Sequence, residues 1–386
     1  MRRLIRIGFM VLAGLVAGSL VAELLFRVIE ATPLWRVLPV SEVSLYGPDP
    51  FTGYRHRVGA HGVWLQENRS NITISSLGLR DRDRPFERSS ATRVVVVGDS
   101  VIEAAQVDLQ DTAVAVAERE LAQRRPGAEV INLGLAGATP AVDIARLQSL
   151  GLSLHPDLAI VVVSIGDFIG LTSDDDSGWT SYKAGSDGEV RLSYGFRNAR
   201  GYKFRTSTGG ALFYWVLDHS ALARVLNSRK NVGFFAEWPR KQETSDNLSP
   251  AEVCKEALQA QRGLWIDGQP TYARKHLDAF LRDLAQFRRE KSLPVVVAFR
   301  GGLPAACEGR DDLRRSIVDT IGARLTAAGL KFADMDQMSR DRAGLRYRAV
   351  MHGFGASRGG GHLNQQGNRI YGEIFRDLIE ANLPPR

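Results

Sequence analysis

Short apolar runs alternate with amphipathic segments along most of the chain, and this alternation predicts the fold. The first run, residues 94–97, is four valines, typical of a strand buried on both faces of a parallel sheet. Because predicted strands and helices alternate along the chain, we expect an α/β fold in which helices cover both faces of a doubly wound parallel sheet. Further strands are predicted at residues 129–133, 158–164, 294–299 and 331–333, and helices at residues 111–124, 141–150, 276–289, 313–328 and 365–381.

The N-terminus follows a different pattern, because residues 7–22 form an unbroken uncharged run. As a helix this run is about 24 Å long, and the apolar residues just after Glu23 extend it to about 30 Å, the thickness of a hydrocarbon core. Arg2, Arg3 and Arg6 precede the run, and basic residues favour the cytoplasmic side of a membrane. We therefore predict a single-pass signal anchor in the inner membrane.

This topology would place everything after Arg27 outside the cytoplasm, in the periplasm. A cleaved signal peptide is the alternative, although Leu20 is bulky for the usual cleavage site. Outside the cytoplasm disulfides form readily. The two cysteines, Cys254 and Cys307, are therefore either bonded to each other or two free thiols.

Changes in pattern along the chain divide it into three parts. Residues 1–30 hold the cytoplasmic tip and the anchor, and residues 31–90, rich in proline and glycine, read as an irregular extracytoplasmic stem with short strands near its end. Residues 91–386 hold the alternating α/β pattern. An insertion at about residues 174–270 interrupts it.

The charge of the chain narrows the choice of partners. The chain has 386 residues and a formal net charge of +7. The insertion alone, over residues 195–241, carries nine basic residues against Asp218 and Glu237, which accounts for the whole surplus. The rest of the chain is formally neutral, so the basic character does not indicate nucleic-acid binding.

The same insertion is rich in aromatic residues, among them Tyr214, Trp215 and Trp238. Three interpretations stay open for it. It packs as a cap over the sheet, it lies against an anionic membrane surface, or it binds a glycan through aromatic stacking and arginine–carboxylate pairs.

Polar residues follow several predicted strands, where open α/β sheets bind ligands. Gly98-Asp99-Ser100 places a hydroxyl directly after the first strand, and Gly137 follows the second, where a glycine offers a backbone N–H to an oxyanion. Asp167 follows the third strand. His362, just before the last helix, is a candidate general base for Ser100.

At these residues the chain resembles the SGNH/GDSL hydrolase superfamily, over about residues 80–170 and 280–381. The resemblance implies a three-layer, flavodoxin-like sheet in which Ser100 is the nucleophile and His362 the base. The N–H groups of Ser100 and Gly137 would form the oxyanion hole. The anchor and the stretch before the first strand also resemble a membrane-anchored bacterial subgroup linked to cell-surface polysaccharide or acyl-ester metabolism.

The chain departs from the family pattern at two positions. The family's third oxyanion donor, an Asn, is replaced by Gly166, and the triad acid three residues before the histidine is replaced by Gly359. A backbone carbonyl of the Gly359–Gly361 turn, or one of the acids Asp167, Asp334 and Asp336, could take the place of the missing acid.

These features leave two hypotheses. One is a Ser–His dyad esterase or O-acyltransferase acting on acylated envelope polysaccharide or glycolipid. The other is a degenerate SGNH fold that serves as a glycan-binding or envelope-assembly factor, with assembly proteins as partners. Asp99, Asp167 and Asn364 are predicted as supporting residues, and the sequence indicates no metal or cofactor.

Overall fold

The computed structural model describes most of the chain. It covers residues 2–32, 34, 45–64, 67–88, 92–164, 166–169, 178–227, 249, 251, 255, 272–301, 311–355 and 358–384. The predictions about Cys254, Cys307 and Trp238 lie outside the described residues.

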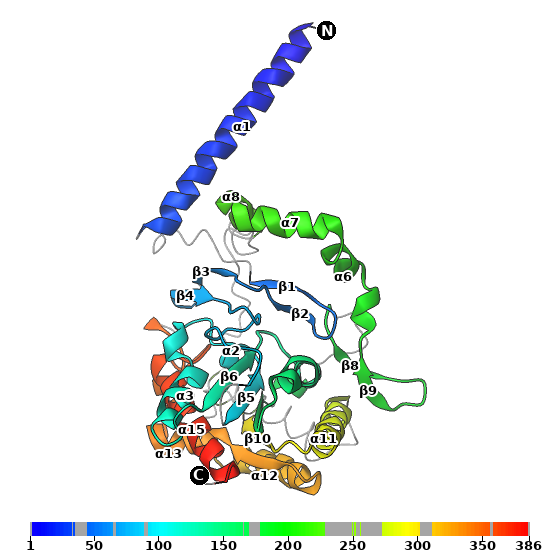
Figure 1. Ribbon diagram of the computed structural model, residues 1–386, viewed down its shortest axis with the longest axis vertical. Helices are drawn as coiled ribbons and strands as arrows, with labels where there is room; N and C mark the ends of the chain where they lie inside the picture. The colour runs from blue at the N-terminus through cyan, green and yellow to red at the C-terminus, as the bar shows by residue number, and fades with distance from the viewer. Residues whose placement is uncertain are drawn as a thin grey trace.

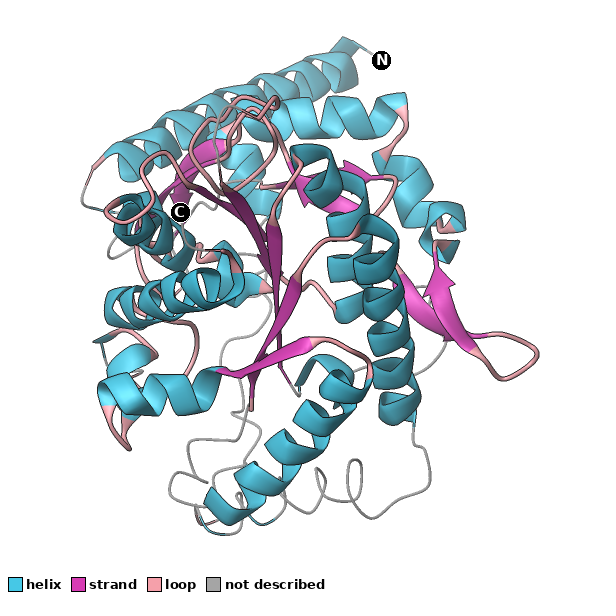
Figure 2. Ribbon diagram, turned by 60° about the horizontal axis from the view of Figure 1, so that its bottom comes forward, coloured by secondary structure: helices cyan, strands magenta, loops and turns pink. Residues whose placement is uncertain are grey.

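A five-stranded parallel sheet forms the centre of the domain, and Figure 2 shows helices on both of its faces. Its strand order is β11-β10-β7-β5-β6. This is the doubly wound order of flavodoxin-like folds, in which the chain reverses direction across the sheet after its second strand. The predicted α/β fold class is confirmed. The strands are β5 (Arg93–Gly98), β6 (Glu129–Gly134), β7 (Leu158–Ser164), β10 (Val295–Arg300) and β11 (Lys331–Asp334).

The valine run of β5 shows how the two cores arise from one strand. Val94 and Val96 face one side of the sheet, and Val95 and Val97 face the other, because successive side chains of a strand point to opposite faces. All four are fully buried. A strand of this kind must be covered on both faces, which explains why its sequence is apolar throughout.

Two groups of helices provide that cover. On the Val95 face pack α4 (Pro140–Arg146), α11 (Tyr272–Lys291) and α12 (Asp311–Ala327). On the Val94 face pack α2 (Ser100–Glu103), α3 (Ala113–Ala122), α13 (Met335–Ala343), α14 (Tyr347–Met351) and α15 (Gln365–Asn382).

One helix differs from its prediction. The helix expected at residues 141–150 begins as α4 and ends in a wider π-helical turn, Leu147–Gly151. There Ser149 Oγ donates to the carbonyl of Ala145 at 2.7 Å, a side-chain bond that competes with the regular helical pattern.

The N-terminal helix α1 (Arg2–Ala31) projects away from the domain (Figure 1). Its segment Ile5–Ala31 is long and apolar enough to cross a membrane, and no part of its most apolar window is buried. Among the residues that the structure describes, it is the one helix with these properties.

The segment expected to be an irregular stem contains two β-hairpins beside the sheet domain. They are β1 (Tyr46–Asp49) with β2 (Gly53–His56), and β3 (His61–Trp64) with β4 (Ser70–Thr73). Figure 1 shows them between α2 and the helices of the insertion. Each strand is only four residues long, so its pairing is set by the contacts of the folded chain and not by a local pattern.

The described part of the insertion is a hairpin followed by a chain of helices. The hairpin is β8 (Ser181–Ala184) with β9 (Val190–Ser193), and the helices are α6 (Arg200–Arg205), α7 (Thr208–His219) and α8 (Ala221–Asn227). Helix α5 (Gly166–Ile169) directly follows β7. In Figure 1, α7 and α8 lie at the end of the domain from which α1 projects.

Candidate active site

Ser100 lies where β5 gives way to the short helix α2. Asp99 is the N-cap of this helix, and its carboxylate accepts a hydrogen bond from the Val101 N–H at 2.9 Å. The helix ends at Ala104, which has a left-handed backbone with φ 55° and donates its N–H to the Ser100 carbonyl. Ser100 is therefore held in a tight turn at the C-terminal edge of the sheet, as the sequence predicted.

The end of β6 packs directly against α2. A Cβ atom at Gly134 would lie 2.2 Å from the backbone nitrogen of Glu103, so only glycine fits there. Asn132 Nδ2 also donates to the carbonyl of Ile102 at 2.9 Å. These contacts fix the helix that begins at Ser100.

His362 lies beside Ser100, although the two residues are 262 positions apart. The distance from His362 Nε2 to Ser100 Oγ is 2.8 Å. His362 precedes α15, whose N-cap Asn364 accepts a hydrogen bond from Gly367 N–H and donates to the carbonyl of Val350 at 3.0 Å. Asn364 therefore positions the turn that carries His362.

The other nitrogen of His362 contacts Glu67, a residue that the sequence analysis missed. Glu67 Oε1 lies 2.7 Å from His362 Nδ1, and Glu67 Oε2 accepts the His362 backbone N–H at 3.0 Å. An ionised carboxylate accepts hydrogen bonds, so Nδ1 carries the proton and the lone pair of Nε2 faces Ser100. Ser100, His362 and Glu67 thus have the geometry of a Ser–His–acid triad.

Glu67 reaches this position from the connection between β3 and β4. It has φ 64°, a left-handed backbone that is uncommon for a residue with a side chain and that clusters at functional sites. Asn68 Nδ2 donates to the carbonyl of Gln106 at 2.9 Å, and Ser70 Oγ donates to the carbonyl of Ala105. The hairpin is therefore tied to the segment that follows α2, next to Ser100.

Gly361 makes room for this acid. A Cβ atom at Gly361 would lie 2.7 Å from Glu67 Oε2, and the residue has φ 74°. Gly359, at the position of the family's usual acid, has no side chain to offer and φ 92°. The carboxylate that contacts His362 is instead that of Glu67, which lies 295 positions earlier in the sequence.

The other substitutes suggested by the sequence have different contacts. Asp334 accepts the N–H of Asp336 as N-cap of α13, Asp336 accepts the N–H of Gly301, and Asp167 accepts the N–H of Ser164 at 2.5 Å. The Gly361 carbonyl accepts from His352 Nδ1 at 3.0 Å. We therefore correct the expectation of a bare Ser–His dyad, because Glu67 occupies the place of the acid.

Gly137 lies in the loop after β6 with φ 73°. The carbonyl before it, that of Ala136, accepts the Tyr54 hydroxyl at 2.8 Å. In a trans peptide the carbonyl and the following N–H point in opposite directions, so the Gly137 N–H points away from Tyr54. At the third expected donor position, Gly166 begins α5 and offers no side-chain amide.

A buried polar cluster supports α2 from the side of the first hairpin. The Tyr46 hydroxyl donates to Glu103 Oε1 at 2.6 Å, and His56 Nε2 is hydrogen-bonded to the same oxygen. Glu103 and His56 are almost completely buried. Both hairpins of the N-terminal segment therefore contact the region around Ser100.

Acidic groups beneath the turn are balanced by Arg300. Arg300 Nη2 donates to Asp99 Oδ2 at 2.7 Å. Burial, with the nearby Asp99 carboxylate, raises the pKa of Asp167 to about 6, although Arg300 opposes this shift. Burial and the same acids raise the pKa of Asp143 well above its usual range. None of these contacts involves His362, so we assign this group a structural role.

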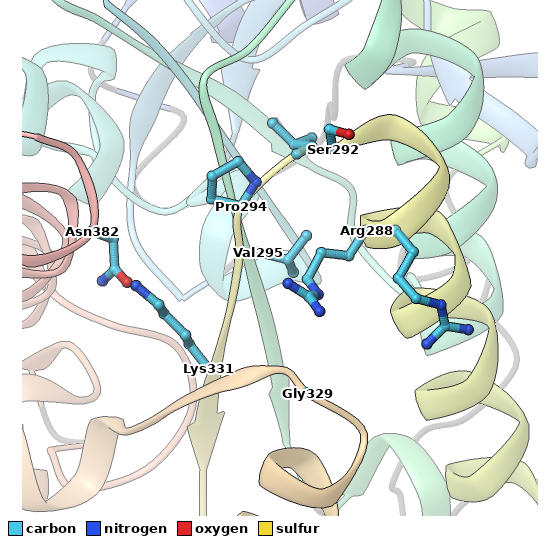
Figure 3. Close-up of a pocket in the computed structure, with 9 residues that line it drawn as sticks. Arg288, Ser292, Pro294, Val295, Gly329, Lys331 and Asn382 are labelled. Carbon is cyan, nitrogen blue, oxygen red and sulfur yellow. The ribbon is translucent and has the colours of Figure 1, made fainter.

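A pocket of 430 Å³ lies at the opposite edge of the sheet (Figure 3). Val295 and Lys331, the first residues of β10 and β11, line it together with Arg288 and Asn382. Ser100 follows the C-terminal end of a parallel strand, so the pocket is remote from it. None of the predicted site residues lines this pocket.

Comparison with known proteins gave matches among solved structures alone. No protein-family model and no curated protein matches the chain. A catalytic mutant of the acetylxylan esterase Axe2 from Geobacillus stearothermophilus shares 15% identity over 76% of this chain and 95% of its own, with a TM-score of 0.37. A lipase/acylhydrolase from Enterococcus faecalis shares 14% identity over 76% of this chain and 98% of its own, with a TM-score of 0.37. TesA shares 15% identity over 76% of this chain and 100% of its own, with a TM-score of 0.38. The function proposed below rests on the geometry of the site and not on these similarities.

The sequence held only an indirect signal for Glu67. The glycine at position 359 indicated that any acid must come from elsewhere, and Glu67 stands between two short apolar segments that were expected to form strands. Nothing local distinguishes it from the other acidic residues of the chain.

Proposed function

We propose that the protein is a serine esterase or O-acyltransferase of the SGNH type that uses Ser100, His362 and Glu67. The continuous hydrogen-bonded series from Ser100 Oγ through the imidazole to Glu67 carries this proposal. Such a series activates a hydroxyl for attack on a carbonyl and recurs on unrelated folds.

The proposed reaction begins when Ser100 Oγ attacks the carbonyl carbon of an acyl ester. The Ser100 proton passes to His362 Nε2, and the resulting imidazolium is stabilised by the Glu67 carboxylate. The tetrahedral intermediate then expels the alcohol, which takes the proton back from Nε2, and the acyl group stays on Ser100. Water completes hydrolysis, whereas a sugar hydroxyl completes acyl transfer.

The backbone N–H groups of Ser100 and Gly137 are the oxyanion donors that we propose. The Tyr54–Ala136 hydrogen bond supports this role, because it fixes the peptide whose N–H belongs to Gly137. With Gly166 in place of an amide side chain, two donors would act instead of three. One such donor contributes about 10²–10³-fold to the rate in a well-studied protease.

We further propose that α1 anchors the protein in the inner membrane and that the α/β domain is periplasmic. Arg2, Arg3 and Arg6 before the apolar run support this orientation. Acylated envelope polysaccharide or glycolipid is the proposed substrate class, and proteins of envelope assembly are the proposed partners.

Labelling of the purified full chain in detergent with a fluorophosphonate, alongside hydrolysis of a p-nitrophenyl acyl ester, tests the chemistry. We expect wild type to be labelled and Ser100→Ala to lose both labelling and hydrolysis, because the nucleophile is gone. A folded wild-type chain that neither labels nor hydrolyses would favour the non-catalytic, glycan-binding alternative. Equal activity in Ser100→Ala would assign the reaction to another residue.

A further inference from the structure

Helix α7 carries four large apolar side chains on the face that points away from the domain. Leu212, Phe213, Trp215 and Val216 are 62%, 41%, 57% and 38% exposed. The opposite side of the helix includes the buried Leu217. Contiguous exposed apolar side chains of this size mark a surface that binds a membrane or another protein.

The orientation of α7 is fixed by its contacts with the first hairpin. Arg57, which follows β2, donates to Asp218 Oδ1 at 2.6 Å and lies 5.1 Å above the ring of Tyr214. Because Tyr214 and Leu217 are held against the domain, the apolar face is directed outward and cannot be buried by a simple rotation of the helix.

The connection between α7 and α8 is attached to α1. Glu23 accepts hydrogen bonds from Ser220 Oγ at 2.8 Å, from Ala221 N–H at 3.0 Å and from Leu222 N–H at 2.8 Å. The Glu23 side chain therefore satisfies backbone donors in the first turn of α8. This attachment lies directly after the uncharged run of α1, residues 7–22.

Two further contacts strengthen the attachment. Arg27 Nη2 donates to the carbonyl of His219 at 2.7 Å, and Arg224 Nη2 lies 3.0 Å from Glu30 Oε2. The charged end of α1 and the end of α7 are thus held at the same level. If residues 7–22 occupy the hydrocarbon core, this level corresponds to the lipid headgroups.

We propose that α7 lies in the surface of the membrane that α1 crosses, with its apolar face in the boundary between headgroups and acyl chains. A lipid surface is favoured over a protein partner because the end of α7 is hydrogen-bonded to α1, the proposed membrane span, directly after its uncharged run. Tryptophan is enriched at this boundary, and the exposed Arg200 and Lys203 of α6 would meet anionic headgroups.

This arrangement would set the distance of the active site from the membrane. The hairpin that holds α7 through Arg57 also places Tyr46 and His56 on Glu103, three residues after Ser100. A membrane-seated α7 would therefore hold the site at a fixed height, suited to an acyl donor or acceptor in or near the bilayer. The inference rests on the proposed membrane span of α1 and is independent of the esterase chemistry.

Fluorescence quenching by lipid tests the inference. The full chain is reconstituted in vesicles that contain phosphatidylglycerol, with and without phospholipids brominated near the middle of one acyl chain, and wild type is compared with Trp215→Phe. If its apolar face is buried about 5–10 Å into the boundary between headgroups and acyl chains, Trp215 lies close to the bromines. The emission of Trp215 is the difference between the emission of wild type and that of Trp215→Phe. We expect the brominated lipid to lower this difference by at least about half.

Trp179→Phe provides the matched control, because Trp179 is also exposed but lies against Tyr54 of β2, whose hairpin stands between α7 and the sheet domain in Figure 1. The emission of Trp179, taken as the difference between wild type and Trp179→Phe, should be almost the same with and without brominated lipid. Circular dichroism establishes that both variants fold, and flotation establishes that the chain stays with the vesicles.

Unquenched Trp215 in a chain that floats with the vesicles would overturn the inference while leaving the membrane span intact. Equal quenching of Trp179 would also overturn it, because the effect would not be specific to α7. A chain that does not float would remove the span and the inference together. In each case, Ser100 labelling reports separately on the proposed chemistry.

Discussion

Ser100 and His362 are held by the sheet domain, whereas Glu67 is held by a hairpin that precedes the sheet. The turn of Ser100 is fixed by buried contacts between α2 and the end of β6, and His362 precedes a helix that packs on the core. Glu67, in contrast, is held mainly by hydrogen bonds from Asn68 and Ser70 to the segment after α2. The sheet domain thus positions Ser100 and His362, whereas Glu67 depends on the separate attachment of the hairpin.

This difference suggests how the site tolerates glycine at position 359. An imidazole needs an acceptor at Nδ1, and the acceptor can come from any part of the chain that reaches it. The hairpin supplies a carboxylate whose two oxygens contact both Nδ1 and the backbone N–H of His362. The separation between acid and base is therefore long in sequence and short in space.

The largest expected effects separate the two regions by magnitude. Removal of the base by His362→Ala should lower kcat by about 10⁶-fold, as for a nucleophile or base in a serine protease. Glu67→Gln should lower it by about 10⁴-fold, because the amide allows the wrong imidazole tautomer. Steady-state hydrolysis of a p-nitrophenyl ester measures both.

Glu67→Asp is the control, because it keeps the carboxylate charge on a side chain that is one methylene shorter. We expect this variant to recover part of the activity lost in Glu67→Gln. Unchanged kcat in Glu67→Gln would show that the hairpin contributes no catalytic acid. The enzyme would then be a Ser–His dyad.

A smaller effect is expected from crowding the acid without removing it. Gly361→Ala would place a methyl group 2.7 Å from Glu67 Oε2, and a displacement of about 1 Å in such a site can cost on the order of 10²-fold in rate. Gly359→Ala is the matched control, because Gly359 also has a positive φ but its Cβ would meet nothing closer than 3.9 Å. Comparable kcat values for the two variants would show that backbone strain, and not contact with Glu67, causes the loss.

The smallest expected effect concerns His352 and the dependence of folding stability on pH. Burial lowers the pKa of His352 from 6.5 to about 4, so the unfolded chain binds a proton more readily than the folded chain between these values. Stability should therefore fall as the pH decreases through this window. In His352→Asn, whose amide can still donate to the Gly361 carbonyl, the slope of Tm against pH should be flatter. An unchanged slope would assign the acid sensitivity to other groups.

The sheet was largely predictable from sequence, because its signals are local. The strand predicted at residues 158–164 has the same bounds as β7. The four valines of β5 correctly predicted a strand that is buried on both faces. Short strands were expected near the end of the stem, where β3 and β4 lie, but β1 and β2 carried no comparable signal, since four-residue hairpins depend on what they pack against. The described part of the insertion contains helices whose attachment to α1 depends on single side chains such as Glu23.

Sequence by itself determined the class of fold, the positions of Ser100 and His362 at the edge of the sheet, and an apolar N-terminal segment. Periodicity and chain order encode these features directly. Only the tertiary structure decided that Glu67 meets His362, 295 positions away, and that Glu23 of α1 meets the connection between α7 and α8. Such contacts depend on the docking of whole hairpins and helices, which brings together residues that no local pattern relates.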